Sequence, residues 1–415
     1  MRPSVFIRFS RFSTIIKKQI IQNAMMAPST QCGMRQTAAP AFGPASSTPS
    51  VGSALSMNSR QRWLYRSLVM IALLTMNLTG GVCTVGDEPR HMPLEESRIR
   101  EAIEAALPLL EKSSRGSANQ RKCFTCHSQA LPVMALSEAR LRNFEIDTNN
   151  YERQIKHTIA HLRKGKKNYA DGKGQGGGVD TAGYALWTLE VGQYPADHIV
   201  DAVTHFLLAS AGDSDHWQCS SNRPPSESSD FTTTYLAIRA LKYYSNDKQQ
   251  IAANERYKST LKWLLSAKPE TTEDKVFHLR SLSYLDAPLK LIKRFTADLI
   301  NAQRIDGGWS QISGMESDPY ATATVLVGLA RTSQTARQQP AYANGISYLL
   351  KHQTEQGSWH VKSRSKPFQK YFETGFPHEE DQFISSTATA WATIALLLSL
   401  PPKESNLLLE IKSQK

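Results

Sequence analysis

The segment Cys123-Phe-Thr-Cys126-His127 is the part of the chain whose residue types and spacing point most directly to chemistry. Two cysteines three positions apart, followed at once by a histidine, form the attachment pattern of a c-type haem. The sequence therefore predicts haem c as a cofactor, bound through thioethers to Cys123 and Cys126, with His127 as axial ligand to the iron. A local disulfide, a redox-active thiol pair and half of a zinc site are the alternative interpretations of the two cysteines.

A sixth iron ligand should come from a segment that the fold brings close to His127. His378, in a Gly-Phe-Pro-His segment, precedes the last predicted helix and lies beside the first one if the helices close into a ring. Met315 and His216 are further candidates, because both fall in loops at the predicted rim.

Aspartates recur where apolar helical segments begin, at Asp180, Asp230, Asp274, Asp318 and Asp381. A helix-capping role alone explains an aspartate at such a position, because its carboxylate accepts hydrogen bonds from the first helical turn. In a closed ring, however, the same positions would surround the mouth of one cavity. We therefore predict a pocket rim formed by Asp180, Arg223, Asp230, Glu316, Tyr320 and Asp381.

The elements that would position these residues are helices, since apolar residues recur at helical spacing from residue 95 onward. Amphipathic segments alternate with more apolar ones, as expected for outer and buried inner helices. The outer segments are near 97–113, 150–164, 196–210, 253–267, 289–303 and 339–353, and the inner ones near 127–142, 180–191, 230–243, 274–286, 318–331 and 381–399. The predicted fold is all-α, an (α/α)6 toroid of six outer and inner helix pairs over residues 95–400.

Two Gln-x3-Gly-x-Trp motifs, Gln303 to Trp309 and Gln353 to Trp359, stand at corresponding joints of this repeat. With the six helix pairs they resemble the squalene cyclase/prenyltransferase repeat superfamily, whose Gln and Trp residues tie outer helices to neighbouring repeats. Four segments together, Cys-x-x-Cys-His-x-Gln-x-Leu-Pro, Arg-Pro-Pro-x-Glu, Gly-Phe-Pro-His and Asp-Gln-Phe-Ile-Ser, resemble exported bacterial proteins that combine one such toroid with a cytochrome-c-like motif. These resemblances imply the fold and the location rather than a reaction.

The resemblance also suggests an alternative function, a squalene or terpene cyclase-like isomerase. Such cyclases protonate an alkene with the middle Asp of an Asp-x-Asp-Asp-Thr-Ala motif, which matches Glu316-Ser-Asp318-Pro-Tyr-Ala here, so Asp318 would be the proton donor. The next acid of the motif is replaced by Pro319, which weakens this match. Aromatic residues on inner segments could stabilise a developing cation, namely Tyr184, Trp187, Tyr235, Tyr320 and Trp391. A non-catalytic or glycan-binding toroid is a third alternative, since glycan-degrading enzymes use paired carboxylates such as Glu316/Asp318 or Glu379/Glu380/Asp381.

The N-terminal 86 residues contain no acid and nine of the 49 Lys and Arg residues. The rest of the chain holds 40 basic and 37 acidic residues, so the basic pI belongs to this leader and does not predict nucleic-acid binding. Three arginines precede an apolar run over 68–78, which is typical of a secretory signal peptide, although an organellar transit peptide is the alternative. We predict an N-terminal extension over 1–56 that is disordered or mis-called, a signal peptide over 57–83 and a C-terminal tail over 401–415.

These observations together predict a periplasmic or secreted toroid with one haem c at its rim. The expected partners are an apolar or isoprenoid small molecule and a redox partner protein. No transmembrane span is expected in the mature chain, since the apolar run is shorter than the roughly 20 residues that span a bilayer. Whether the protein is an enzyme stays open at this stage.

Overall fold

A computed structural model describes residues 94–366 and 370–400, and every regular element in these ranges is helical. The outer helices are α3 (Leu94–Gln120), α5 (Thr148–Lys164), α8 (His198–Ser210), α10 (Gln250–Ser266), α12 (Leu289–Asn301) and α14 (Pro340–His352). The inner helices are α4 (Leu131–Leu141), α7 (Gly178–Val191), α9 (Asp230–Tyr244), α11 (Thr272–Tyr284), α13 (Pro319–Thr332) and α15 (Gln382–Ser399). A π-helical turn η1 (Cys126–Ala130) precedes α4, and the short elements α6 (Lys166–Ala170), η2 (Thr335–Gln338) and η3 (Glu379–Asp381) lie in connections.

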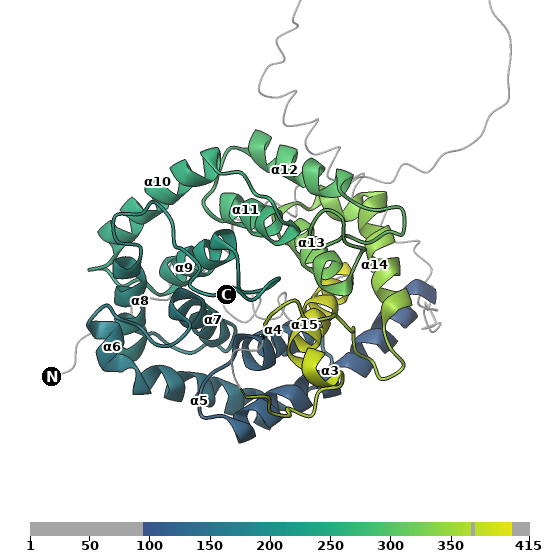
Figure 1. Ribbon diagram of the computed structural model, residues 1–415, viewed down its shortest axis with the longest axis horizontal. Helices are drawn as coiled ribbons and strands as arrows, with labels where there is room; N and C mark the ends of the chain where they lie inside the picture. The colour runs from purple at the N-terminus through teal and green to yellow at the C-terminus, as the bar shows by residue number, and fades with distance from the viewer. Residues whose placement is uncertain (1–93, 367–369, 401–415) are drawn as a thin grey trace, which may run out of the picture. The chain divides into compact units, whose positions relative to one another are not determined.

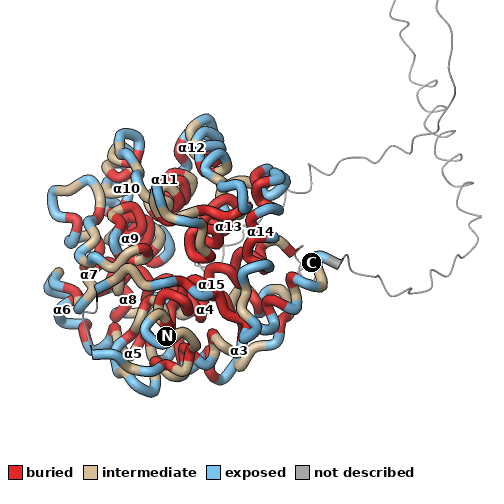
Figure 2. Tube along the Cα trace, turned by 45° about the vertical axis from the view of Figure 1, so that its right-hand side comes forward, coloured by how far each residue is buried: buried red, intermediate tan, exposed pale blue. Residues whose placement is uncertain are grey.

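The helices form a closed toroid, which confirms the predicted fold class. Each inner helix packs against the next, and α15 packs against α4 and η1, so the last inner helix meets the first (Figure 1). The inner helices are buried nearly all round, whereas the outer helices are exposed on one side (Figure 2). This difference follows from the sequence, because α13 and α15 consist almost entirely of apolar residues and small Ala, Ser and Thr residues.

Both Gln-x3-Gly-x-Trp motifs act as joints between repeats. The side-chain amide of Gln303 donates to the carbonyl of Ala341 on α14 at 2.7 Å, and that of Gln353 donates to Ala102 on α3 at 2.8 Å. The second bond links the last outer helix to the first and so closes the outer ring. Each motif tryptophan donates its indole N–H to the carbonyl ten residues earlier, Trp309 to Leu299 at 2.8 Å and Trp359 to Leu349 at 2.8 Å.

A third joint of the same kind occurs at Trp217, which the sequence motif does not reveal. Its indole donates to the carbonyl of Leu207, again ten residues earlier, at 2.7 Å. Its backbone N–H donates to the Thr234 hydroxyl at 3.1 Å, just as that of Trp309 donates to the Thr322 hydroxyl at 2.9 Å. The tryptophan contacts therefore persist in a repeat that has lost the flanking Gln and Gly.

The first outer helix is longer than the sequence indicated. The Ser113-Ser-Arg-Gly116 stretch is typical of a loop, but α3 continues through it to Gln120. The reason is tertiary packing, since the Ser113 hydroxyl lies 3.0 Å from that of Ser386 on α15. A Cβ at Gly116 would meet the carbonyl oxygen of Thr374 at 1.8 Å, so only glycine allows this approach.

The predicted N-terminal extension, signal peptide and C-terminal tail fall outside the described residues. Among the helices that are described, no helix has both the length and the apolar character needed to cross a membrane.

Candidate functional site

The N-terminal ends of the inner helices meet at one rim of the toroid, and the Cys123–His127 segment runs there from the loop after α3 into η1. Cys123 is exposed and Cys126 is buried, and both thiols are free, so the alternative of a local disulfide is not what the structure shows. Burial raises the pKa of the Cys126 thiol well above its ordinary value, and the nearby charges of Glu227 and Asp180 raise it further. A thiol of this kind is a poor nucleophile, which disfavours a redox-active thiol pair.

The carboxylate closest to this segment is Glu227, which the sequence analysis did not select. It is 5% exposed and stands in a hairpin-like turn, in which Arg223 and Glu227 pair through both backbone amides at 2.8 and 3.0 Å. The Arg223 guanidinium forms an ion pair with the Glu227 carboxylate. Burial alone would raise the pKa of Glu227, but His127 and Arg223 together hold it below its ordinary value. Glu227 is thus a buried, ionised carboxylate.

His127 lies between this carboxylate and an open cavity. Its Nδ1 is 3.7 Å from Oε1 of Glu227, and its ring meets the edge of the Phe383 ring at 5.2 Å between centroids. No hydrogen bond to Nε2 occurs among the described residues. The imidazole therefore has one nitrogen directed at a carboxylate and the other without a partner.

The cavity beside His127 has a volume of about 630 Å³, within the range of small-molecule and cofactor sites. Its wall combines His127, Glu227 and Arg223 with residues of the 362–387 segment. That segment contributes Lys362, Tyr371, His378, Asp381, Phe383 and Thr387, among others. The fold therefore brings the two histidines that the sequence analysis paired, His127 and His378, into one cavity.

His378 differs from the other two predicted iron ligands in this respect. Met315 and His216 do not line the His127 cavity, and His216 stacks on Trp263 at 4.1 Å. A hydrogen bond of 2.7 Å joins Nε2 of His378 to the Ser358 hydroxyl, and the His378 ring stacks on the His360 ring with 4.6 Å between centroids. Burial, followed by the charge of His360, lowers the pKa of His378, so a neutral imidazole is favoured.

The predicted rim residues are distributed over several places rather than one. Arg223 and Asp381 line the His127 cavity, whereas Tyr320 lines a smaller one and Glu316 a third. Asp180 and Asp230 are not among the residues that line these three cavities. The reason is that their carboxylates are used locally.

Asp180 and Asp230 both bind the 217–221 loop and its surroundings. Asp180 accepts from the Cys219 thiol at 3.2 Å and from the Thr233 hydroxyl at 2.5 Å, and burial raises its pKa to about 6. Asp230 accepts from the backbone N–H of Cys219 at 2.7 Å. These two aspartates anchor a loop instead of facing a ligand.

Of the five aspartates at predicted helix starts, Asp318 is the one whose carboxylate caps its own helix as predicted. Asp318 caps α13 by accepting from the backbone N–H of Ala321 at 3.1 Å. In α11 the cap is Thr271, and Asp274 forms the returning half of a capping box. Asp381 makes no capping bond to α15, because its carboxylate binds His360 at 2.9 Å and the backbone N–H of Ser363 at 2.7 Å.

Asp318, the predicted proton donor, does not face the His127 cavity. It lines a separate cavity of about 530 Å³ together with Glu316, Arg304 and Tyr348. Burial raises the pKa of Asp318 to about 6, which makes it a weaker acid than an ordinary aspartate. Protonation of an alkene requires an unusually strong acid, so this environment disfavours a cyclase role.

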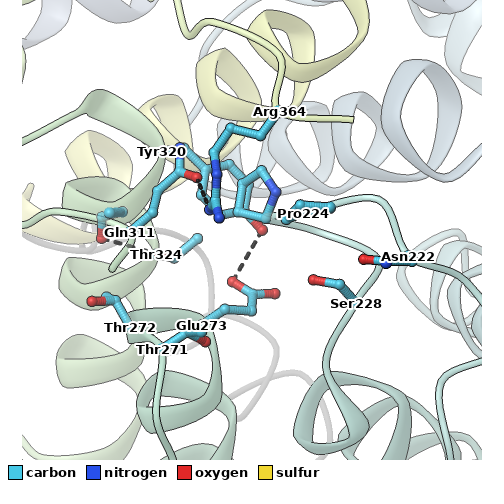
Figure 3. Close-up of a pocket in the computed structure, with 12 residues that line it drawn as sticks. Asn222, Pro224, Ser228, Thr271, Thr272, Glu273, Gln311, Tyr320, Thr324 and Arg364 are labelled. Carbon is cyan, nitrogen blue, oxygen red and sulfur yellow. Dashed lines mark hydrogen bonds between the residues drawn. The ribbon is translucent and has the colours of Figure 1, made fainter. Parts of the chain in front are cut away.

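A smaller cavity of about 240 Å³ adjoins the His127 cavity, since Pro224 lines both. Figure 3 shows Glu273, Tyr320, Gln311 and Arg364 converging on it from α11, α13 and the loops that follow Trp309 and Trp359. Glu273 is 4% exposed and accepts hydrogen bonds from the Tyr320 hydroxyl at 3.0 Å and the Thr232 hydroxyl at 2.9 Å. Burial raises the pKa of Glu273 to about 8, so its carboxyl is a neutral acid near neutral pH.

Sequence reasoning missed Glu273 because it precedes Asp274, which accounts for the helix start on its own. It quoted the Arg-Pro-Pro-x-Glu segment that contains Glu227 but assigned no role to this residue, because nothing in the loop sequence indicates which side chain is buried.

Comparison with known proteins agrees with the architecture. A probable squalene–hopene cyclase of Sinorhizobium fredii (strain NBRC 101917 / NGR234) is 34% identical over 98 residues, which are 21% of this chain and 14% of that protein. Together with the Gln and Trp joints described above, this match decides the kind of toroid. The fold is that of the squalene cyclase and prenyltransferase toroids. No protein-family model matches the chain.

Solved structures of low identity show similar toroids. The ent-copalyl diphosphate synthase of Streptomyces platensis is 19% identical, with a TM-score of 0.44 over 66% of this chain and 50% of that one. The type II terpene cyclase MstE of Scytonema is 13% identical, with a TM-score of 0.48 over 72% of this chain and 98% of that one. A glycosidase in complex with glucose is 11% identical, with a TM-score of 0.49 over 74% of this chain and 99% of that one. The chain spans half or less of the cyclase of Sinorhizobium fredii and of the synthase of Streptomyces platensis.

Proposed function

We propose that this chain is an exported toroid that carries one haem c at its rim and acts in redox chemistry there. The haem would be attached through Cys123 and Cys126, with His127 as the axial ligand. The observation that carries the proposal is the placement of His127, whose Nδ1 faces the buried Glu227 carboxylate while its ring lines a cavity of about 630 Å³. Histidines that bind metals in proteins commonly direct their other ring nitrogen at a carboxylate or carbonyl, which fixes the tautomer.

The side chains at the rim fit a haem in three respects. The two thiols are free, as thioether attachment requires. Glu227 would hold His127 with its proton on Nδ1, leaving Nε2 to bind iron. The cavity wall is mostly polar and charged, but it includes Tyr371, Phe383 and Ile384, which would contact a planar apolar ring system. When bound, the haem supplies one-electron transfer.

The residues of the chain itself would control access and charge at this site. Arg223 is held by Glu227 at the cavity wall, and Lys362 and Lys366 line it as well. These cations would balance the negative charge of haem propionates or of an acidic partner. His378 would be the second axial ligand after releasing its hydrogen bond to Ser358. An apolar or isoprenoid molecule is the proposed small-molecule ligand, and a redox protein the proposed macromolecular partner.

The experiment that tests this function uses the full chain, produced with its leader in a bacterial host that attaches haem c. The native protein is expected to bind haem with two strong-field ligands, which gives a low-spin absorption spectrum. His378→Ala should convert it to a high-spin spectrum, whereas Met315→Ala and His216→Ala should leave it unchanged. A colourless native protein that is folded and exported would overturn the proposal, and a low-spin spectrum in all three variants would overturn the role of His378.

Binding of a glycan is the second candidate function, and the smaller cavity favours it. The cavity of about 240 Å³ is lined by hydroxyl, amide and guanidinium groups, with Pro224, Pro225 and Tyr320 as its apolar surfaces. Such a mixture suits a sugar ring. A titration with mono- and disaccharides should then show binding that Arg364→Met weakens and that Arg304→Met does not, and binding that is equal in both variants would count against this site.

A further inference from the structure

The interior of the toroid, away from the rim, contains a buried arginine without an acidic partner. Arg280 lies in the third turn of α11 and is 5% exposed. Among the described residues its one hydrogen bond runs from Nη2 to the Tyr235 hydroxyl at 3.0 Å. A guanidinium has five N–H donors, and no carboxylate of the described chain lies within ion-pair distance of this one.

Four aromatic rings enclose the Arg280 guanidinium. Its central carbon lies 4.4 Å from the ring centre of Tyr235, 4.9 Å from Phe277, 5.2 Å from Trp187 and 5.5 Å from Trp391. Ring faces attract cations, but they carry no net negative charge that could neutralise a guanidinium. An isolated buried charge is costly, and proteins normally provide it with a counter-ion. Three of the aromatic residues predicted to stabilise a cation, Trp187, Tyr235 and Trp391, thus already contact a cation of the chain.

The neighbouring charges do not neutralise Arg280. Arg239 on α9 donates to Glu190 at 2.7 Å and to the same Tyr235 hydroxyl at 3.2 Å, and its buried Nε has no partner. Arg331 is paired with Glu138, which also accepts from Arg142 at 2.7 Å. Two guanidiniums therefore share the Tyr235 hydroxyl while only one carboxylate, Glu190, balances them.

We propose that the toroid interior binds a small monovalent carboxylate between Arg280 and Arg239, independently of the haem site. The carboxylate would accept hydrogen bonds from N–H groups of Arg280 that have no partner among the described residues, and Arg239 would supply the neighbouring positive charge. A single negative charge matches the single uncompensated positive charge, which favours a carboxylate over a phosphate dianion. The surrounding tryptophan and phenylalanine rings would contact an apolar body attached to it, so the ligand class is an apolar or aromatic monocarboxylic acid.

Ionisation of Tyr235 is the other way in which the chain could supply the missing negative charge. Its hydroxyl lies between the two guanidiniums, and although burial would raise the pKa of Tyr235, Arg280 and Arg239 lower it below the ordinary value. A phenolate would neutralise the pair and leave no site for an anion. The experiment must therefore distinguish a bound carboxylate from a phenolate.

The test measures thermal unfolding of the full chain with sodium benzoate, acetate or chloride at constant ionic strength. Benzoate is expected to raise the melting temperature in a saturable way, acetate less and chloride not at all. Arg280→Met should weaken benzoate binding by about tenfold or more, because a charge-assisted hydrogen bond contributes roughly 1.5 to 3 kcal/mol. Arg294→Met is the matched control, since Arg294 also lies over a phenylalanine, Phe295 at 5.5 Å, but on the exposed outer helix α12.

Three results would overturn the proposal: no shift with benzoate, an equal shift with chloride, or an unchanged shift in Arg280→Met. A near-ultraviolet phenolate signal at neutral pH that Tyr235→Phe removes would show that the tyrosine is the counter-ion instead. Should Arg280→Met fold poorly, quenching of tryptophan fluorescence by a nitrobenzoate provides the second measurement, because Trp187 and Trp391 border the site. Quenching of the native chain that saturates and is reversed by benzoate would support the proposal, and its absence would contradict it.

Discussion

Replacing Glu273 with glutamine is expected to abolish a loss of stability that the native protein undergoes as the pH rises. Burial raises the pKa of Glu273 to about 8 in the folded state, while a glutamate in the unfolded chain titrates at about 4.3. Between these values the folded state retains a proton that the unfolded chain has released. The free energy of unfolding therefore falls with rising pH across this window and levels off above the folded pKa.

The size of the effect follows from the same two values. One pKa unit corresponds to about 1.36 kcal/mol, so the loss between pH 6.5 and 8 is roughly 2 kcal/mol. This interval separates Glu273 from two other buried carboxyls. Burial raises the pKa of Asp180 and Asp318 only to about 6, so these two carboxyls have largely titrated at the lower end of the interval. Burial lowers the pKa of His161 to about 4, whereas a histidine in the unfolded chain titrates near 6.5, so His161 adds stability as the pH rises through this interval. The difference between the native and Glu273→Gln profiles therefore isolates the glutamate.

The assay is urea unfolding followed by circular dichroism at several pH values between 6.5 and 8. Relative to Glu273→Gln, the native chain should lose about 2 kcal/mol over this interval, and Glu270→Gln, an exposed control three residues away, should behave as the native chain. Glutamine keeps the shape and can still bind Thr232 and Tyr320. Equal slopes in the native chain and in Glu273→Gln would refute the assignment of a neutral carboxyl at this position.

Two further predictions concern the joints that close the ring. Gln353→Ala removes the hydrogen bonds to Ala102 and Gly357 and should lower the free energy of unfolding by about 2 kcal/mol. The control Gln339→Ala, at an exposed position, should change it by less than about 0.5 kcal/mol. Equal losses of the two variants in urea unfolding would contradict the role of Gln353 in closing the ring. The backbone φ of Gly357 is 89°, and a Cβ added there would lie 2.4 Å from the carbonyl oxygen of Ala105. Gly314 has a similar φ of 85° but no atom within 4 Å of an added Cβ. Gly357→Ala should therefore lower the melting temperature clearly more than Gly314→Ala does. If both alanines cost the same, the close approach of α3 to this joint is not what requires glycine.

The fold could be predicted because its information is repeated along the chain. Alternating amphipathic and apolar segments appear six times, so an uncertain boundary in one repeat is corrected by the others. Where a single segment stood alone, the prediction failed. The end of α3 was placed too early because Gly116 suggests a turn, and only the contact with Thr374, more than 250 positions away, shows why the helix continues.

The site was predictable only in part, for a similar reason. His127 and His378 are brought together by ring closure, which follows from the number of repeats, and the structure places both in one cavity. The partners of buried charges have no such regularity. Whether a rim aspartate faces a ligand or a loop depends on side-chain direction, and Asp180 and Asp230 turned toward the Cys219 loop. Glu227 and Glu273 became visible only through their burial and their hydrogen-bond partners.

Covalent haem is the central claim, and the most direct measurement is the mass of the denatured chain together with a pyridine haemochrome spectrum. The full chain should be exported in a host with a cytochrome c maturation system, beside a Cys123→Ser/Cys126→Ser variant. The account predicts that the native chain retains the mass of one haem after denaturation, with the spectrum of two thioether links, and that the variant retains none. A native chain of unmodified mass, exported and folded in that host, would contradict the account.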